Sequence, residues 1–212
     1  MNPKVKSLLH EIGNIDLWTN NLKRIDSEFQ AWFKTIRKWN RTINLVSRFS
    51  TDLDHHLYDS LQYLRVIPLN GKILDIGSGA GFPGVALKIV HPVLKLVLLD
   101  SKKKRVNFLK TLVRELKLDE TQVLWGRAEE ISLNASYQNS FDLVSLRGVG
   151  GSKLCLELGG LFLKTNGVLV IKQKCEEIFN ESSPGFKLEK EIPITGFRGS
   201  KSKLMVFSKC ST

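Results

Sequence analysis

The chain has 212 residues, of which 42% are hydrophobic and 25% are charged, a composition typical of a globular protein. No run approaches the roughly 20 apolar residues that span a bilayer, and the N-terminal residues lack a long apolar segment followed by a small-residue cleavage site. We therefore expect neither a membrane span nor a secretion signal. The net charge of +11 is spread along the whole chain and favours a polyanionic partner such as RNA.

The three cysteines, Cys155, Cys175 and Cys210, stand far apart and lack the CxxC spacing of metal or redox sites. Free thiols in a reducing compartment are the default for such a pattern. The sequence therefore predicts a cytoplasmic protein without a metal.

Two helices are predicted in the first part of the chain. Apolar residues recur every three or four positions over residues 22–43, and residues 51–64 form a second candidate helix, while residues 1–15 indicate at most a short one. In the second helix His56 and Asp59 lie three residues apart, so we expect a hydrogen bond between them or a helix cap. A turn at Pro68 to Gly71 closes this region. Residues 1–70 are thus predicted to be an N-terminal helical extension, and residues 71–212 the main domain.

From residue 72 onward, short apolar strands alternate with helical segments. The pattern predicts strands at 72–76, 95–99, 121–125, 141–146 and 168–172, and helices at 83–90, 102–117, 128–131 and 152–164. Two further strands are expected near 187–194 and at 204–208. The fold class is therefore α/β, with a mostly parallel seven-stranded sheet that ends in an antiparallel strand pair.

Residues 73–84 read ILDIGSGAGFPG, a strand that passes through a glycine-rich turn into a helix. Such a turn lets the backbone approach a nucleotide-type cofactor closely. The segment formally matches GxGxxG, the dinucleotide fingerprint, but it also matches the acidic, alternating-glycine turn of S-adenosylmethionine (SAM) methyltransferases. Asp75 favours the second interpretation, because a carboxylate repels a pyrophosphate but suits the ammonium group of SAM. Gly77, Gly79 and Gly81 are then the glycines of the turn.

Further candidate site residues follow the other predicted strands. Asp100 ends the second strand, where a carboxylate can accept hydrogen bonds from both ribose hydroxyls of an adenosine or can instead cap the next helix. Ala128 and Glu129 follow the third strand, where adenine would lie. Arg147 follows the fourth strand, where substrate meets cofactor, and could bind a phosphate or a carboxylate.

Basic residues next to these positions are candidates for contact with RNA phosphates, although solvated charge is the plainer explanation. The first group opens the helix after Asp100 and the second lies on the last turn of the chain. The candidates are Lys102, Lys103, Lys104, Arg105, Arg198 and Lys201.

With these motifs the chain resembles the RsmG (GidB) family, bacterial 16S ribosomal RNA guanine-N7 methyltransferases. The matching segments are KWNRTINLVS (38–47), HLYDSL (56–61), LDIGSGAGFPG (74–84), LLDSKKKRVNFL (98–109), RAEE (127–130) and FDLVSLRGVG (141–150). The resemblance implies a Rossmann-like class I fold, SAM as cofactor, and one guanine in the 530 loop of 16S rRNA as target. It also implies cofactor contacts at Gly77, Phe82, Ala128, Glu129 and Arg147.

Guanine N7 is an unprotonated acceptor, so its methylation needs no general base. We therefore expect no catalytic residue beyond positioning groups, with Arg147 and Phe82 as the nearest candidates, and a monomer that acts on 16S rRNA or a small-subunit assembly intermediate. The alternatives are a methyltransferase for another RNA base or a protein, a non-catalytic ribosome-binding protein, and a nicotinamide oxidoreductase. The chain departs from the family pattern at Leu146, Gly148 and Gln173, which concerns the loop on the substrate side.

Overall fold

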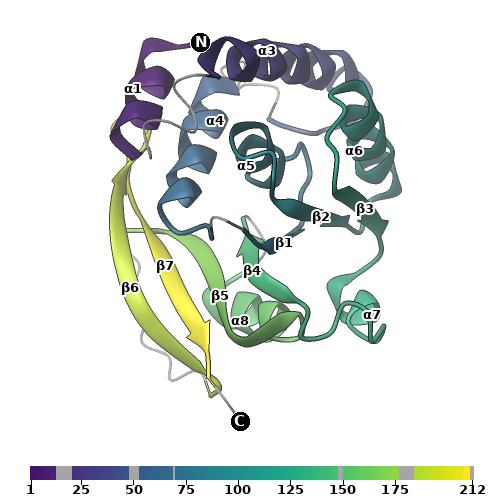
Figure 1. Cartoon of the computed structure of the whole chain (residues 1–212), viewed down its shortest axis with the longest axis vertical. Helices are drawn as coiled ribbons and strands as arrows, with labels where there is room; N and C mark the ends of the chain where they lie inside the picture. The colour runs from purple at the N-terminus through teal and green to yellow at the C-terminus, as the bar shows by residue number, and fades with distance from the viewer. Residues whose placement is uncertain (13–20, 48–52, 69, 148–149, 177–183, 211–212) are drawn as a thin grey trace.

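The computed structural model describes residues 1–12, 21–47, 53–68, 70–147, 150–176 and 184–210. Within these ranges, seven strands form one sheet in the order β3-β2-β1-β4-β5-β7-β6 (Figure 1). The strands are β1 (Lys72–Ile76), β2 (Lys95–Asp100), β3 (Thr121–Trp125), β4 (Phe141–Leu146), β5 (Leu163–Lys174), β6 (Phe186–Thr195) and β7 (Lys201–Lys209). The first five run parallel, and β7 lies antiparallel between β5 and β6, as the sequence predicts.

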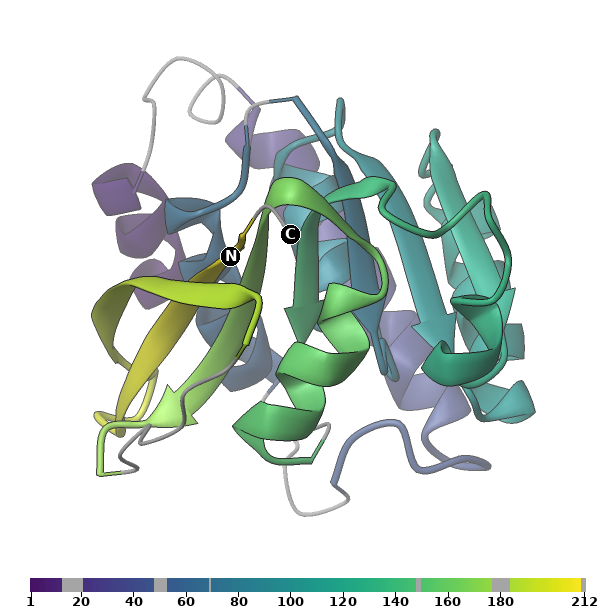
Figure 2. The ribbon, with the colours of Figure 1, turned by 90° about the horizontal axis from the view of Figure 1, so that it is seen from below.

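Helices cover both faces of this sheet. They are α1 (Pro3–Ile12), α3 (Leu22–Trp39), α4 (Leu53–Leu61), the 3-10 helix η1 (Gln62–Arg65), α5 (Gly84–Val90), α6 (Lys103–Glu115), α7 (Ala128–Ile131) and α8 (Ser152–Gly160). Figure 2 looks at the sheet from the side of α7 and α8, with the N-terminal helices behind it. Side chains alternate along each strand, so Ile73 and Leu98 pack toward α3–α6 while Leu74 and Val97 pack toward α7 and α8.

The predicted helix over 152–164 is too long. Helix α8 ends at Gly160, and β5 already begins at Leu163, which pairs with Phe141 of β4. The register between these strands shifts after that pair, so an irregular stretch precedes the regular part of β5, which begins at Val168. A strand interrupted in this way lacks a continuous period of two, which explains why its first residues resembled the end of a helix.

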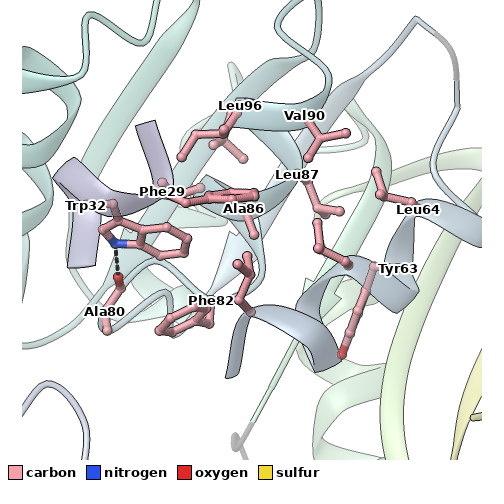
Figure 3. Packing of buried hydrophobic residues seen from close by; sticks show 14 of the residues in the cluster. Phe29, Trp32, Tyr63, Leu64, Ala80, Phe82, Ala86, Leu87, Val90 and Leu96 are labelled. Atoms are coloured by element: carbon pink, nitrogen blue, oxygen red, sulfur yellow. Dashed lines mark hydrogen bonds between the residues drawn. The ribbon is translucent and has the colours of Figure 1, made fainter. Parts of the chain in front are cut away.

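The N-terminal helices share a hydrophobic core with α5 and α6. Trp32 of α3 is completely buried, and its indole N–H donates a hydrogen bond to the carbonyl of Ala80 in the glycine-rich turn at 3.0 Å (Figure 3). The Trp32 and Phe82 ring centroids lie 4.5 Å apart. The helices of residues 1–65 therefore brace this turn from one side, while the predicted domain boundary between residues 70 and 71 stays a prediction.

In the described part of the chain, no helix combines the length and the apolar character needed to cross a membrane.

Candidate functional site

An open cleft of about 730 Å³ lies at the carboxyl ends of β1, β2, β3 and β4. Strand β1 lies between β2 and β4, so the chain leaves β1 toward one side of the sheet and later returns on the other. Open α/β sheets bind ligands at such a topological switch point, and the volume falls within the range of small-molecule sites. The N-terminal region closes part of the cleft with Leu45 to Ser47 and with His55 and His56 of α4.

The glycine-rich turn forms the floor of this cleft. The backbone N–H groups of Gly77 and Ser78 both donate to the carbonyl of Leu99, at 2.8 and 3.1 Å, so the turn is tied to β2. Gly77 and Gly79 line the cleft with φ of +75° and +56°, in the left-handed region that glycine adopts at little cost. A Cβ added at Gly79 would meet no heavy atom closer than 3.7 Å, so this position has room for a methyl group in ordinary van der Waals contact.

Asp100 lines the cleft at the end of β2 and is 4% exposed. One of its carboxylate oxygens accepts a hydrogen bond from Gly79 N at 2.9 Å, and the other accepts from Lys102 N at 2.8 Å. The carboxylate thus ties the glycine turn to the residue that precedes α6, although α6 has Lys102 as its N-cap residue and no side chain caps it. Each carboxylate oxygen has a second lone pair, which leaves acceptor capacity for a ligand hydroxyl.

Asp75 and Gly81, both predicted to bind cofactor, are not among the residues that line the cleft. The Asp75 carboxylate is 1% exposed and accepts hydrogen bonds from Ser145 Oγ at 2.9 Å and from Gly84 N at 3.2 Å. Burial raises the pKa of Asp75 to about 6, against the lowering effect of these hydrogen bonds. Its side chain connects β1 to β4 and to α5.

Arg147 enters the cleft from the end of β4 and is held by α4. Its Nη1 donates to His56 O at 3.3 Å and to Ser60 Oγ at 3.1 Å, and its Nη2 lies 3.0 Å from His56 Nδ1. The guanidinium carbon lies 6.0 Å from the centre of the Phe82 ring, and the His56 ring packs on Phe82 with centroids 5.4 Å apart. Arg147, His56 and Phe82 therefore form one wall of the cleft.

The predicted pairing of His56 with Asp59 is wrong. Asp59 is 2% exposed and forms an ion pair with Lys172, with Arg147 Nη2 and His55 Nε2 each 3.8 Å from the same oxygen. His56 instead accepts from Arg147 at Nδ1, since a guanidinium only donates hydrogen bonds. Burial, reinforced by the charge of Arg147, lowers the pKa of His56 to about 4, so its imidazole is neutral at pH 7.

Ala128 and Glu129 line the cleft at the start of α7, as expected for residues that follow β3. Of the three departures from the family pattern, Leu146 is buried at the end of β4, and Gly148 lies outside the described residues. Gln173 is in β5, and its Oε1 is buried without a hydrogen-bond partner. No group of three or more His, Cys, Asp or Glu residues suited to a metal ion occurs within the described ranges.

The predicted RNA-binding residues fall into two groups at the same edge of the sheet. Lys102, Lys103 and Lys104 are exposed at the start of α6, and Lys102 and Arg105 also line the cleft. Arg198 and Lys201 are exposed at the β6–β7 turn, which lies at the other end of the strand order from β2 and β3. Because β7 begins beside the end of β5, this turn lies at the same edge of the sheet as the carboxyl ends of the parallel strands, but Arg198 and Lys201 do not line the cleft.

Residues 25–194 match the model of a protein family described as rRNA small subunit methyltransferase G, also called GidB. The chain belongs to this family. A ribosomal RNA small subunit methyltransferase G from Dictyoglomus thermophilum is 34% identical over 177 residues, which cover 80% of this chain and 72% of the relative. The protein of the same name from Lactococcus lactis is 38% identical over 148 residues, which cover 68% of this chain and 62% of the relative.

Solved structures share the fold of this family member. A SAM-dependent methyltransferase from Aquifex aeolicus matches 76% of this chain and 95% of its own, with a TM-score of 0.56 and 19% identity. The M. jannaschii protein TYW2, solved in complex with AdoMet, matches 80% of this chain and 78% of its own, with a TM-score of 0.59 and 13% identity. At these identities the likeness establishes architecture, and it confirms the predicted Rossmann-like class I methyltransferase fold.

Several residues of this methyltransferase G family member escaped prediction as site residues. His55 and His56 line the cleft, Ser145 binds Asp75, and Lys172 pairs with Asp59. The HLYDSL segment at 56–61 carries the family resemblance and was the available signal for His56 and Asp59. Nothing in the sequence around Ser145 or Lys172 indicates which distant carboxylate each would meet.

Proposed function

We propose that this protein transfers the methyl group of S-adenosylmethionine to N7 of a guanine in the 530 loop of 16S rRNA. Membership of the rRNA small subunit methyltransferase G family supports methylation of ribosomal RNA. The observation that carries the cofactor assignment is the cleft, in which the glycine-rich turn, Asp100 and Arg147 come together. The position of the modified base follows from the family resemblance of the motifs.

The cleft residues suit SAM by their chemistry. Asp100 offers acceptor lone pairs to ribose hydroxyls, and Gly79 keeps the cleft clear of a side chain at that point. Arg147 offers a positive charge to the cofactor carboxylate. We propose that the cofactor is held by Gly77, Gly79, Phe82, Asp100, Ala128, Glu129 and Arg147, all of which line the cleft. Asp75 and Gly81 would act indirectly, by shaping the turn.

When bound, SAM supplies an electrophilic methyl group on a positively charged sulfur. Guanine N7 carries a free lone pair, so the protein has no proton to remove before the transfer. His56 is in keeping with a transfer that needs no general base. Its imidazole is neutral, and the ring nitrogen that could take a proton, Nδ1, already accepts a hydrogen bond from Arg147. The residues of the cleft would therefore act by orienting base and cofactor and by excluding water.

The RNA is proposed to contact both basic groups at this edge of the sheet through its phosphates. They are Lys102, Lys103, Lys104 and Arg105 on one side and Arg198 and Lys201 on the other. N7 is hidden in the deep major groove of double-stranded RNA, so the target guanine must be unpaired when it enters the cleft. We further propose that the protein works as a monomer in the cytoplasm, on 16S rRNA or on an assembly intermediate of the small subunit.

The test is methyl transfer from labelled SAM to 16S rRNA and to small ribosomal subunits, followed by mapping of the labelled base. Gly79→Asp serves as the disabled variant, because it adds a second carboxylate beside Asp100 and places a side chain at the cleft. Gly185→Asp is the matched control: Gly185 also has a positive φ, of +81°, but an added Cβ meets nothing within 4 Å. It lies at the start of β6, at the edge of the sheet opposite the cleft.

Label at N7 of one guanine, lost in Gly79→Asp and retained in Gly185→Asp, supports the proposal. Label on another base or only on protein contradicts the assigned target. RNA binding without SAM binding would indicate a non-catalytic ribosome-binding protein. Unchanged SAM affinity in Gly79→Asp would mean that the cofactor site is misplaced.

A further inference from the structure

Trp125 is a large apolar side chain exposed at the rim of the cleft. It ends β3 and is 54% exposed, and among the exposed large hydrophobic residues of the described ranges it is the only aromatic one. The next residues, Gly126 and Arg127, line the cleft. An exposed tryptophan costs free energy in water, and at a functional edge it commonly serves recognition.

The indole ring is held in one orientation. Its Nε1–H donates to the carbonyl of Ser101 at 3.1 Å, and Ser101 itself lines the cleft. The Lys103 ammonium lies 3.8 Å from the ring centroid, in a cation–π contact. More than half of the side chain stays accessible although Lys103 covers part of it. The ring is therefore held by two contacts and stays partly open, so a flat ligand can stack on the part that Lys103 leaves exposed.

The surroundings of this platform are basic on the side of α6. Lys102, Lys103 and Lys104 are all exposed there, while Asp100, the nearby carboxylate, is buried and uses both oxygens for backbone hydrogen bonds. Glu129 belongs to α7, which packs on the other face of the sheet. A flat π-surface next to clustered cations matches the two parts of a nucleotide, the base and the phosphate.

We propose that Trp125 stacks on an unpaired base of the substrate RNA next to the target nucleotide, while the lysines at the start of α6 hold the adjoining phosphates. This inference rests on the proposed function and adds to it a specific single-stranded RNA contact. Bases within a duplex have both faces covered by their neighbours, so the platform selects unpaired RNA. The adenine of the cofactor is a poorer candidate ligand, because Trp125 does not line the cleft.

The test compares binding of a fluorescent single-stranded RNA oligonucleotide and of the corresponding duplex to four proteins: wild type, Trp125→Ala, Trp125→Phe and Val93→Ala. Val93 is the matched control, because it is 59% exposed and precedes β2 at the edge of the sheet opposite the cleft. Loss of one stacked base should raise the Kd of Trp125→Ala for the single strand by about 5- to 150-fold. The phenylalanine variant should recover most of the affinity, and Val93→Ala should equal wild type.

Affinity for SAM, measured by calorimetry, should be the same in all four proteins, and thermal unfolding should show that all four are folded at the temperature of the assay. The proposal is overturned if Trp125→Ala binds the single strand like wild type, if single strand and duplex lose affinity equally, or if SAM binding is the property that falls.

Methyl transfer to rRNA is measured in parallel. A large loss of single-strand binding in Trp125→Ala without any methyl transfer by wild type would refute the proposed function and leave the RNA contact standing. Normal methylation with unchanged RNA affinity in the variant would refute the contact alone.

Discussion

Gly79 and Gly81 belong to one turn, yet an added methyl group should act differently at the two positions. At Gly79 the Cβ of an alanine would lie 3.7 Å from Gly77 O and 3.9 Å from Arg105 Nη1, which are ordinary contacts. At Gly81 the same atom would lie 2.7 Å from Val85 Cγ2 and 3.2 Å from Trp32 Cζ2. The first glycine thus borders the cleft, and the second lies where the turn meets α5 and α3.

These contacts set the size of the expected effects. The φ of +56° at Gly79 costs an alanine about 1–2 kcal/mol of folding stability, and no steric term adds to it. Gly81 has a φ of +98°, so the backbone cost is at least similar, and overpacking against Val85 and Trp32 adds about 1–3 kcal/mol. We therefore expect Gly81→Ala to lose about 2–5 kcal/mol and Gly79→Ala about 1–2 kcal/mol.

Equilibrium urea unfolding of both variants measures this difference in stability. A SAM titration should rank the two variants the other way, with the greater loss of affinity in Gly79→Ala. Gly79→Ala places a methyl group in the cleft, so it should weaken SAM binding more per kcal/mol of lost stability than Gly81→Ala does. Equal losses of stability, or a larger loss at Gly79, would refute the assignment of Gly81 to the packing of α3 on the turn.

Three further predictions concern single charges. Asp59→Asn removes the buried partner of Lys172 and should lower the free energy of unfolding in urea by about 3–5 kcal/mol. Adding Lys172→Met should restore most of this stability. If the double variant is as unstable as Asp59→Asn, the ion pair is contradicted. Burial raises the pKa of Asp75 to about 6 from about 3.9 when unfolded, so the folded protein binds this proton more tightly. The resulting stability is complete below pH 4, and about 3 kcal/mol of it is lost as pH rises through 6. Asp75→Asn should lack this decline. If the free energy of unfolding falls equally in both proteins between pH 4 and pH 7, Asp75 is not its source. Lys103→Ala should reduce the slope of log Kd for RNA against log salt by about 1, and an unchanged slope would remove Lys103 from the phosphate contacts.

The hydrophobic pattern determined most of the architecture. Strands β1, β3 and β4 begin and end at the predicted residues, and the antiparallel pair at the end of the chain was expected as well. The glycine-rich turn and the polar residues at the strand ends were predictable for a local reason. In a parallel sheet the residues that follow each strand gather at one edge, so their sequence positions already place them near the cleft.

Tertiary structure alone decided what each of these side chains contacts. Asp75 was predicted to contact the cofactor, and the structure adds a hydrogen bond from Ser145, 70 residues away on the neighbouring strand, which the sequence did not indicate. His56 was expected to pair within its own helix, but Arg147, 91 residues away, reaches its imidazole first. The sequence pattern determines which residues lie at the edge of the sheet, because the hydrophobic period shows where each strand ends. Which oxygen meets which donor depends on the packing of α4 and β4 against β1, and that packing is set by side chains from the whole chain.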